Sequence, residues 1–169
     1  MLIVFGGLPG TGKTTIAREL ARQLGAVHLR IDSIEQALRA YCVGRRSLDD
    51  AGYRVAYAVA ADILSVGRMV IADSVNPLPV TRDAWVAVAK RTRARIVEVE
   101  IICSDPDEHR KRAENRVSDI PGLTLPTWQE TISREYCSWD RSHLVVDTAR
   151  QSVEQSVQIL REAIAAQRE

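Results

Sequence analysis

The sequence has few cysteines, few lysines and few aromatic residues, and it has no long apolar run. Its three cysteines are Cys42, Cys103 and Cys137, without the C-x-x-C spacing of a redox pair or a zinc site. We therefore expect no disulfide framework, and a reducing compartment such as the cytoplasm. No stretch approaches the roughly 18 apolar residues of a membrane-spanning helix. The apolar start at residues 1–5 ends at Gly6 and follows no basic segment, so we expect neither a signal peptide nor a membrane anchor.

Charge of either sign is also not in excess. The 23 Lys and Arg residues against 22 Asp and Glu residues give a formal net charge of +1, and aromatic residues make up 5% of the chain. Because nucleic acids and membrane surfaces attract basic patches, and bases stack on aromatic rings, this composition disfavours both partners. Only Lys13, Lys90 and Lys111 are lysines. Codon usage in the source genome and recognition of planar oxyanions by arginine both explain this, and composition does not choose between them.

The length of 169 residues suits one domain, which we expect to span residues 1–169. Short apolar runs alternate with segments of helical periodicity, and this predicts an α/β fold with helices on both faces of a parallel sheet of about five strands. In such sheets ligands bind beyond the carboxyl ends of the strands. The strands are expected at residues 2–5, 27–31, 69–72, 96–103 and 144–146, and the principal helices at residues 33–41, 52–65, 84–93, 106–117 and 127–139.

A glycine-rich segment follows the first expected strand. Residues 7–14 read Gly-Leu-Pro-Gly-Thr-Gly-Lys-Thr and match G-x-x-x-x-G-K-[ST], a phosphate-binding loop (P-loop) between a strand and a helix. Its glycines let backbone N–H groups turn toward phosphates, and the following helix points its positive end at them. Lys13 is expected to reach the β- and γ-phosphates, and the Thr14 hydroxyl to bind Mg²⁺. The expected nucleotide-binding residues are Gly7, Gly10, Thr11, Gly12, Lys13, Thr14 and Thr15.

The P-loop indicates a nucleoside triphosphate without saying what happens to it. The Asn-Lys-x-Asp motif with which GTPases read guanine is absent from the sequence. A D-x-x-G pattern at residues 49–52 follows Arg45, Arg46 and Ser47 and begins inside a polar segment, 44–50, that we expect to be a loop. Since no apolar strand precedes this pattern, we interpret it as coincidental. The chain is also too short for a large ring-forming ATPase.

Four features carry a resemblance to a known group: the P-loop, the segment 30–33, Asp73 and the arginine-bearing helix 106–117. In these features, and in element order over essentially the whole chain, the sequence resembles the small P-loop kinases. The resemblance is to the chloramphenicol phosphotransferase-like and zeta-toxin-like branch, with shikimate, gluconate and adenylylsulfate kinases as more distant relatives. It implies a three-layer, nucleoside-kinase-like P-loop NTPase fold with a short lid at about residues 117–126.

Asp32 follows the second expected strand, at the edge of the crevice. In the phosphotransferases that this sequence resembles, an Asp at this position accepts the proton of the substrate hydroxyl. A carboxylate there can orient the acceptor oxygen in line with the γ-phosphate. Asp32 and Glu35 also fit a capping box, in which two acids three residues apart bond the first N–H groups of a helix. The two roles are compatible, and the resemblance implies the catalytic one.

Asp73 ends the third expected strand, in the position of a Walker-B acid. It is expected to hold a water on Mg²⁺ or to contact the acceptor, with a turn-forming role before residues 74–77 as the alternative. Asn76 and Arg82 follow in the same stretch of sequence. We expect these two side chains, together with Asp73, to line the acceptor pocket.

Arg112 and Arg116 lie four residues apart and so share a face of the expected helix 106–117. In the resembled kinases an R-x-x-x-R pair before the lid clamps phosphate charge during transfer. Arginine supplied to the transition state is worth on the order of 10³ or more in rate. The alternative is a solvated charged helix with partners such as Glu108, followed by an inert surface loop. On the catalytic interpretation residues 117–126 form a lid that excludes water.

These observations predict an ATP- and Mg²⁺-dependent kinase that transfers the γ-phosphoryl group to a hydroxyl of a small-molecule acceptor. Asp32 would be the base, and Lys13, Arg112 and Arg116 would neutralise the transferring group. One alternative is a polynucleotide 5′-hydroxyl kinase, which the near-zero charge disfavours. The other is a nucleotide-binding ATPase or switch without an acceptor. No motif names the acceptor or the oligomeric state.

Overall fold

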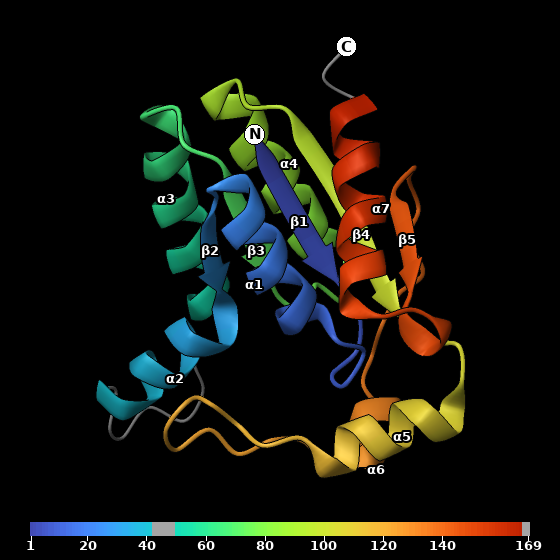
Figure 1. The fold of residues 1–169 in the computed structure, drawn as a ribbon. Coiled ribbons are helices and arrows are strands. Elements are labelled where there is room, and N and C mark those ends of the chain that lie inside the picture. Colours follow the sequence, from blue (N-terminus) through green and yellow to red (C-terminus); the bar gives the residue numbers. More distant parts are fainter. Residues whose placement is uncertain (42–49, 167–169) are drawn as a thin grey trace.

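The computed structural model describes residues 1–41 and 50–166, and its centre is a parallel five-stranded sheet (Figure 1). The strand order is β2-β3-β1-β4-β5. This arrangement confirms the predicted α/β class and places the apolar β1, whose five residues are all buried, in the middle of the sheet. The strands are β1 (Leu2–Gly6), β2 (Val27–Arg30), β3 (Val70–Asp73), β4 (Ile96–Ile102) and β5 (Leu144–Asp147).

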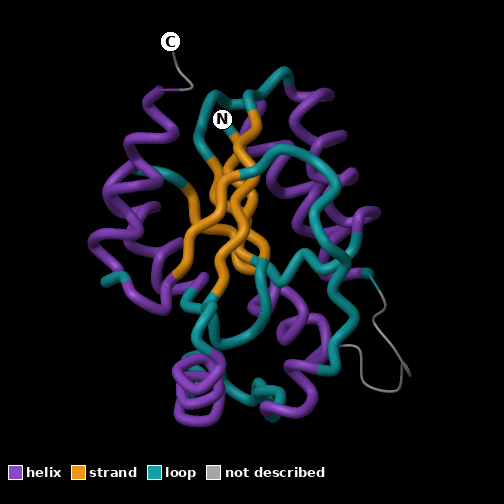
Figure 2. The backbone as a smooth tube through the Cα atoms, turned by 90° about the vertical axis from the view of Figure 1, so that its right-hand side faces the viewer, coloured by secondary structure: helices purple, strands orange, loops and turns teal. Residues whose placement is uncertain are grey.

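Helices cover both faces of the sheet (Figure 2). On one face α1 (Lys13–Leu24) and α7 (Val153–Ala166) pack their apolar stripes on the strands, with Leu20 and Leu160 fully buried. On the other face α3 (Ala51–Ser65) and α4 (Pro79–Thr92) enclose a second core around Trp85. Such burial on both faces is the reason that parallel strands read as continuous apolar runs.

The remaining helices lie beyond the carboxyl ends of the strands. These are α2 (Ile31–Tyr41), α5 (Pro106–Asn115) and α6 (Trp128–Ile132), with the single turn η1 (Thr148–Arg150) after β5. Residues 116–127 connect α5 to α6 and run beneath α1 toward α2 (Figure 1). No helix in the described ranges is long and apolar enough to cross a bilayer.

Several predicted boundaries were wrong. α2 begins at Ile31 directly after β2, so Asp32 is the second residue of the helix and not the cap of a capping box. α4 begins at Pro79, five residues before the expected start, because proline is well suited to the first helical turn. The expected helix 127–139 is a single short helix, α6, capped by a Thr127–Glu130 capping box. The predicted loop 44–50 falls outside the described residues apart from Asp50.

Candidate functional site

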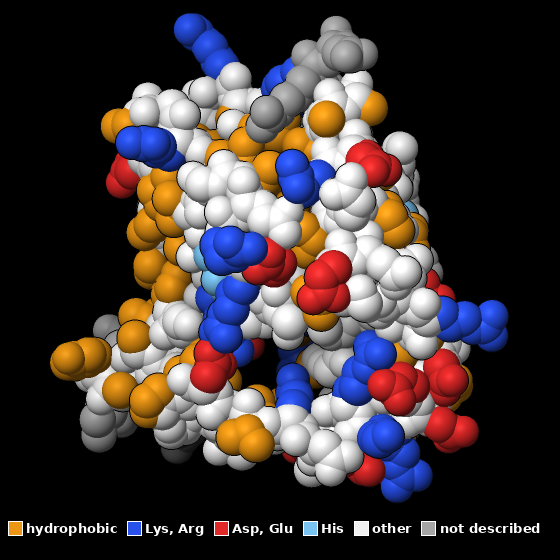
Figure 3. Space-filling model, viewed as in Figure 1, with side chains coloured by type: hydrophobic (Ala, Val, Ile, Leu, Met, Phe, Trp, Pro, Cys, Tyr) orange, Lys and Arg blue, Asp and Glu red, His pale blue; other side chains and the backbone are white. Residues whose placement is uncertain are grey.

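A cavity of about 520 Å³ opens at the carboxyl end of the sheet. Figure 3 shows it as a hollow between the body of the protein and the segment below, with Lys and Arg side chains in its wall. Its lining comes from the P-loop, α1, the starts of α2 and of the segment after β3, α5 and the loop that follows α5. The charged residues among them are Lys13, Arg18, Arg30, Asp32, Glu35, Arg39, Asp73, Arg112, Arg116, Asp119 and Arg134.

The P-loop lies between β1 and α1, as the motif predicts. Gly7, Gly10 and Gly12 have φ angles of 132°, 86° and 93°, which side-chain-bearing residues rarely adopt. A Cβ on Gly7 would lie 2.1 Å from the carbonyl oxygen of Ile101. The loop is thus folded tightly against the end of β4, and the N-terminus of α1 points into the cavity as an anion site.

α5 supports the loop from the far side. The His109 side chain is buried, and its Nε2 lies 2.8 Å from the carbonyl oxygen of Pro9. The same ring meets Trp128 of α6 edge-on, at 5.0 Å between centroids. His109 therefore connects the P-loop to α6. The sequence carries no signal for this role, because a lone histidine on a charged helix forms no recognisable pattern.

Lys13 lies at the start of α1 with only 7% of its side chain exposed. Its Nζ donates a 2.8 Å hydrogen bond to the carbonyl oxygen of Leu8, so the ammonium folds over the loop. Burial lowers the pKa of Lys13 to about 8, although the nearby carboxylates of Asp73 and Asp32 favour the charged form. The charge of Lys13 is therefore held at the centre of the cavity, between the cradle and these two carboxylates.

Asp73 is buried at the end of β3, opposite the start of α1. Its Oδ2 lies 3.0 Å from Nε2 of His28. Burial disfavours its charged form, but hydrogen bonds from His28 and Thr14 and the charge of Lys13 prevail and lower its pKa. An ionised carboxylate beside the Thr14 hydroxyl is a set of oxygen donors that suits Mg²⁺, which binds few protein ligands alongside phosphate oxygens. These two residues therefore fit the expected metal.

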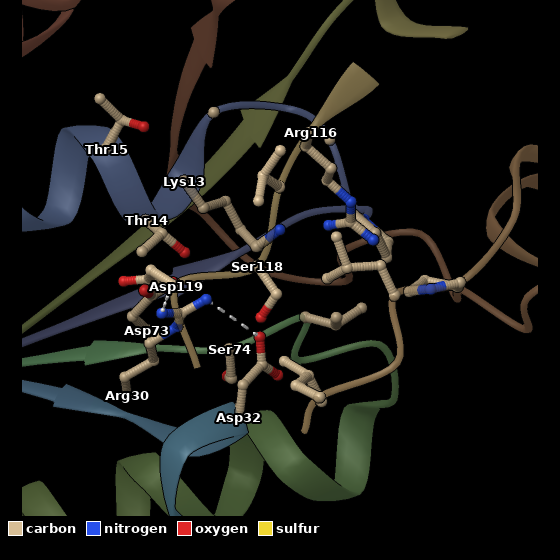
Figure 4. A pocket seen from close by; sticks show the side chains of 18 of the residues that line it. Lys13, Thr14, Thr15, Arg30, Asp32, Asp73, Ser74, Arg116, Ser118 and Asp119 are labelled. Carbon is tan, nitrogen blue, oxygen red and sulfur yellow. Dashed lines mark hydrogen bonds and ion pairs between the residues drawn. The ribbon is translucent and has the colours of Figure 1, made fainter. Parts of the chain in front are cut away.

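Thr15, the last of the expected nucleotide-binding residues, is exposed at the rim of the cavity. Figure 4 shows its side chain pointing away from Asp73 and Asp32. Thr11 is buried, and its Oγ1 donates a 2.9 Å hydrogen bond to the carbonyl oxygen of Leu8. The Thr11 side chain thus stabilises the turn of the loop.

Asp32 faces Lys13 across the cavity from the first turn of α2 (Figure 4). Its side chain is 48% exposed, and its nearest described ion-pair partner is Arg30, whose Nη2 lies 3.8 Å from Oδ2. At that distance the carboxylate is not hydrogen-bonded to the guanidinium. Asp32 is thus accessible and within the electrostatic reach of Lys13.

Arg112 is held by partners from its own helix and from η1. Its Nε donates a 2.8 Å hydrogen bond to Oε1 of Glu108. Its Nη1 and Nη2 donate hydrogen bonds to the Oγ1 and the carbonyl oxygen of Thr148. The Oγ1 of Thr148 also lies 2.9 Å from the carbonyl oxygen of Thr11. Arg112 therefore connects α5, η1 and the P-loop. Its ion pair with Glu108 is also the contact expected of the alternative, a solvated charged helix.

Arg116 differs from Arg112 in position and in partners. It caps the C-terminus of α5 with extended backbone angles, φ −70° and ψ 142°. The prediction that the two arginines share a helix face was therefore wrong. Its Nε and Nη2 are buried without a hydrogen-bond partner among the described residues. Burial lowers its pKa, against the charge of Asp32. In Figure 4 its guanidinium points into the cavity on the same side as Lys13.

The loop after α5 closes over the cavity through ion pairs. Asp119 pairs with Arg18 of α1 and with Arg30 at the end of β2. Farther along the loop, Nε2 of Gln36 donates a 3.4 Å hydrogen bond to the carbonyl oxygen of Pro121. The sequence offered a signal for Arg18, since it lies one helical turn after Thr14 on the same face of α1.

The structure does not bring Asn76 and Arg82 to the cavity. Both are fully buried. Arg82 donates hydrogen bonds to the carbonyl oxygens of Asn76, Pro77, Cys137 and Ser138, so it fastens the segment after α6 to the start of α4. Arg134, which sequence analysis missed, lies in the cavity wall instead.

A family model named AAA_33, described as an AAA domain, matches residues 2–134. Uncharacterized protein Rv2004c of Mycobacterium tuberculosis is 31% identical over 179 residues, covering 96% of this chain and 35% of that protein. Uncharacterized protein Mb2027c of Mycobacterium bovis matches with the same values. The chain thus spans about a third of the length of the curated relatives it matches.

Solved structures match over almost the whole chain. The Mycobacterium tuberculosis APS kinase CysC in complex with AMPPNP and APS gives a TM-score of 0.75 at 20% identity, covering 97% of this chain and 96% of that one. Chaetomium thermophilum Kti12 in complex with ADP-AlF3 gives 0.68 at 24%, covering 97% and 99%. A gluconokinase from Sinorhizobium meliloti gives 0.62 at 17%, covering 99% and 97%. At these identities the likeness shows a shared fold.

Proposed function

The chain belongs to the AAA_33 family, and from this membership we propose that it is an ATP- and Mg²⁺-dependent kinase that phosphorylates a hydroxyl group of a small molecule. The resemblance to P-loop kinases noted in the sequence is confirmed by the family match and the shared fold. Two of the structural neighbours are named as kinases of small molecules, APS kinase and gluconokinase. Two were solved with a nucleotide or nucleotide analogue, AMPPNP and ADP-AlF3.

The observation that carries the proposal is the composition of one cavity. It is lined by the P-loop with Lys13, by the accessible carboxylate of Asp32, and by Arg116, two of whose nitrogens have no hydrogen-bond partner in the part of the chain that the structure describes. A pure nucleotide-binding switch binds no acceptor and has no need of an accessible carboxylate to orient one. A kinase does, because the acceptor hydroxyl must be oriented toward the phosphorus and lose its proton.

In the proposed reaction Lys13 and Arg116 neutralise the charge that develops on the transferring group. Arg112 supports the site from α5 through Thr148 and the P-loop. Asp32 accepts the proton of the acceptor hydroxyl as its oxygen attacks the γ-phosphorus. Lid residues 117–126 exclude water, which would otherwise compete with the acceptor.

Thr14 and Asp73 would hold Mg²⁺, whose charge supports transfer by drawing electron density from the β- and γ-phosphate oxygens. Asp73 is kept ionised in this position by His28, Thr14 and Lys13. Its carboxylate can therefore bind the ion directly or through a water. Asn76 and Arg82 take no part in the proposed reaction, because they lie behind the cavity wall.

The proposal is tested by a transfer screen with γ-labelled ATP against a panel of small alcohols, including sugars, nucleosides and sugar acids. We expect a labelled small molecule from the wild-type protein. Lys13→Ala should reduce transfer by at least about 10²-fold, because it removes a charge from the transition state. Lys111→Ala, at an exposed position on α5, is the matched control and should leave transfer unchanged. Asp32→Asn should retain ATP binding but lose transfer.

Other outcomes of the same screen contradict the proposal. Release of inorganic phosphate without any labelled acceptor indicates an ATPase or switch. Labelled oligonucleotide, with binding that falls steeply as salt is added, indicates a polynucleotide kinase. Full turnover by Asp32→Asn removes the assignment of the base while leaving a kinase possible.

A further inference from the structure

Arg30 lies between two carboxylates that come from different parts of the chain (Figure 4). Its Nη1 donates a 2.7 Å hydrogen bond to Oδ1 of Asp119 in the lid. Its Nη2 lies 3.8 Å from Oδ2 of Asp32. The guanidinium is therefore hydrogen-bonded to the lid carboxylate and only in electrostatic contact with the proposed catalytic base.

Because the Arg30 guanidinium is largely buried, it matters energetically which carboxylate it pairs with. The Arg30 side chain is only 13% exposed, and its Nε is buried without a hydrogen-bond partner among residues 1–41 and 50–166. A largely buried guanidinium that loses one carboxylate must find another acceptor, since an unpaired buried charge is costly. Asp32 is the other carboxylate within ion-pair distance in the described chain.

Arg30 and Asp119 differ in their attachment to the fold. The backbone of Arg30 is fixed in the sheet, where it pairs in register with Asp73 of β3. Asp119 belongs to the loop between α5 and α6, which is fastened to the body by side-chain contacts from Arg18, Arg30 and Gln36. If the lid opens, Asp119 leaves and Arg30 stays behind beside Asp32.

We propose that Asp119 is a positioning residue that couples lid closure to the catalytic base by drawing Arg30 away from Asp32. This inference rests on the proposed function, in which Asp32 is the base. In the open state Arg30 pairs directly with Asp32 and occupies the oxygens that would receive a proton. In the closed state Arg30 turns to Asp119, and Asp32 is free to bind the acceptor hydroxyl.

The acceptor oxygen forms a bond to the γ-phosphorus, and the bond from that phosphorus to the β,γ-bridging oxygen breaks. ADP leaves with the electron pair, and the hydroxyl proton passes to Asp32. A carboxylate paired tightly with a guanidinium is a weaker base, so the coupling delays proton acceptance until the lid has closed and water is excluded.

The test is a double-mutant cycle on kcat and KM with an acceptor found in the transfer screen. Asp119→Asn removes the lid charge with little change of shape, and Arg30→Gln removes the guanidinium but keeps a polar group. We expect Asp119→Asn to lower kcat at least about tenfold, with the KM for ATP changing less than about twofold. Adding Arg30→Gln to Asp119→Asn should raise kcat again at least about threefold, because no guanidinium is left to pair with Asp32.

Arg18→Met is the matched control. It removes the other ion pair of Asp119, which contributes to lid docking without contact to Asp32 in the described structure. Adding Arg30→Gln to Arg18→Met should lower kcat or leave it as it is. A merely structural lid contact predicts instead that Arg30→Gln lowers kcat in the wild-type background and does not raise it in the Asp119→Asn background, where the ion pair is already lost. That result overturns the relay.

Folding and function are checked separately. The Kd for an ATP analogue verifies that each variant retains the fold, and Arg30→Met replaces Arg30→Gln if the latter fails to bind nucleotide. Wild-type transfer together with loss of transfer in Asp32→Asn establishes the proposed reaction independently of the relay. If transfer is lost in Asp32→Asn and Arg30→Gln does not raise the kcat of Asp119→Asn, only the role of Asp119 is rejected. An active Asp32→Asn rejects both the base and the relay.

Discussion

Gly10 and Gly67 both have a positive φ, at 86° and 77°, but their surroundings differ. A Cβ on Gly10 would lie 3.0 Å from Cβ of Ala113 and 3.2 Å from its Cα, whereas a Cβ on Gly67 would meet nothing within 4 Å. A larger residue at Gly10 must therefore strain its own backbone and also push the P-loop away from α5. At Gly67 only the backbone strain applies.

Gly10→Ala is expected to weaken binding of an ATP analogue at least about tenfold, because the cradle cannot keep its N–H groups directed at the phosphates. Gly67→Ala is expected to lower the free energy of unfolding by about 1 kcal/mol without changing nucleotide affinity. Isothermal titration calorimetry and urea unfolding measure the two effects. Equal nucleotide affinities for the two variants would contradict the assigned contact with Ala113.

At the scale of elements, β4 shows how one strand serves two environments. Val97, Val99 and Ile101 face the core under α1 and α7. The alternate residues Glu98 and Glu100 face the segment that follows α6. Glu100 is satisfied, since its oxygens lie 2.8 Å from the Tyr136 hydroxyl and 3.2 Å from Nε2 of His143. Glu98 has one buried oxygen without a hydrogen-bond partner in the described chain, and burial raises its pKa.

The two glutamates therefore predict opposite effects of the same substitution. The folded-state pKa of Glu98 is raised, so the folded protein is relatively more stable when Glu98 is protonated. This contribution to the free energy of unfolding is fully present below pH 4.5 and is lost as the pH rises through the folded-state pKa. Glu98→Gln should thus stabilise the protein at pH 7, by at most about 1 kcal/mol since water screens the half-exposed group. The gain should vanish near pH 4. Urea unfolding at the two pH values measures it.

Glu100→Gln is the comparison on the same strand. It replaces an acceptor of two hydrogen bonds, and we expect it to lower the free energy of unfolding at pH 7 by about 1–2 kcal/mol. Equal changes of stability in the two variants would show that the segment after α6 does not distinguish the two carboxylates.

At the scale of the whole molecule, ion pairs between charged side chains join the lid to the body. Asp119 is 48% exposed and pairs with Arg18 and Arg30, which lie 101 and 89 residues away in the sequence. The sheet, in contrast, is held by two apolar cores that cover its faces. Salt should therefore weaken the attachment of the lid without weakening the sheet.

We expect amide hydrogen exchange in residues 117–126 to quicken in 1 M NaCl, where the screening length falls to about 3 Å. Amides of β1 should exchange at the same slow rate at both salt concentrations, since the strand is completely buried. Mass spectrometry of proteolytic fragments resolves the two regions. Lid exchange that does not respond to salt would indicate that apolar contacts, and not the Asp119 pairs, hold it closed.

The sequence by itself determined the features that depend on neighbouring residues. The P-loop occupies eight consecutive residues between an apolar strand and an amphipathic helix, and local backbone geometry dictates it. The alternation of apolar runs and helical periodicity likewise required a parallel sheet covered on both faces. These signals placed Lys13, Thr14, Asp32 and Asp73 at one edge of the sheet, where the structure has them.

Only the tertiary structure decided what each arginine contacts. Arg82 and Arg116 both looked like binders of the substrate or phosphate, but Arg82 bonds four backbone carbonyl groups and Arg116 lies in the cavity wall. Arg18 and Arg30 meet Asp119 from the other half of the chain. A guanidinium binds any acceptor that packing brings within reach. Its role therefore depends on contacts between distant segments, which no local pattern of residues encodes.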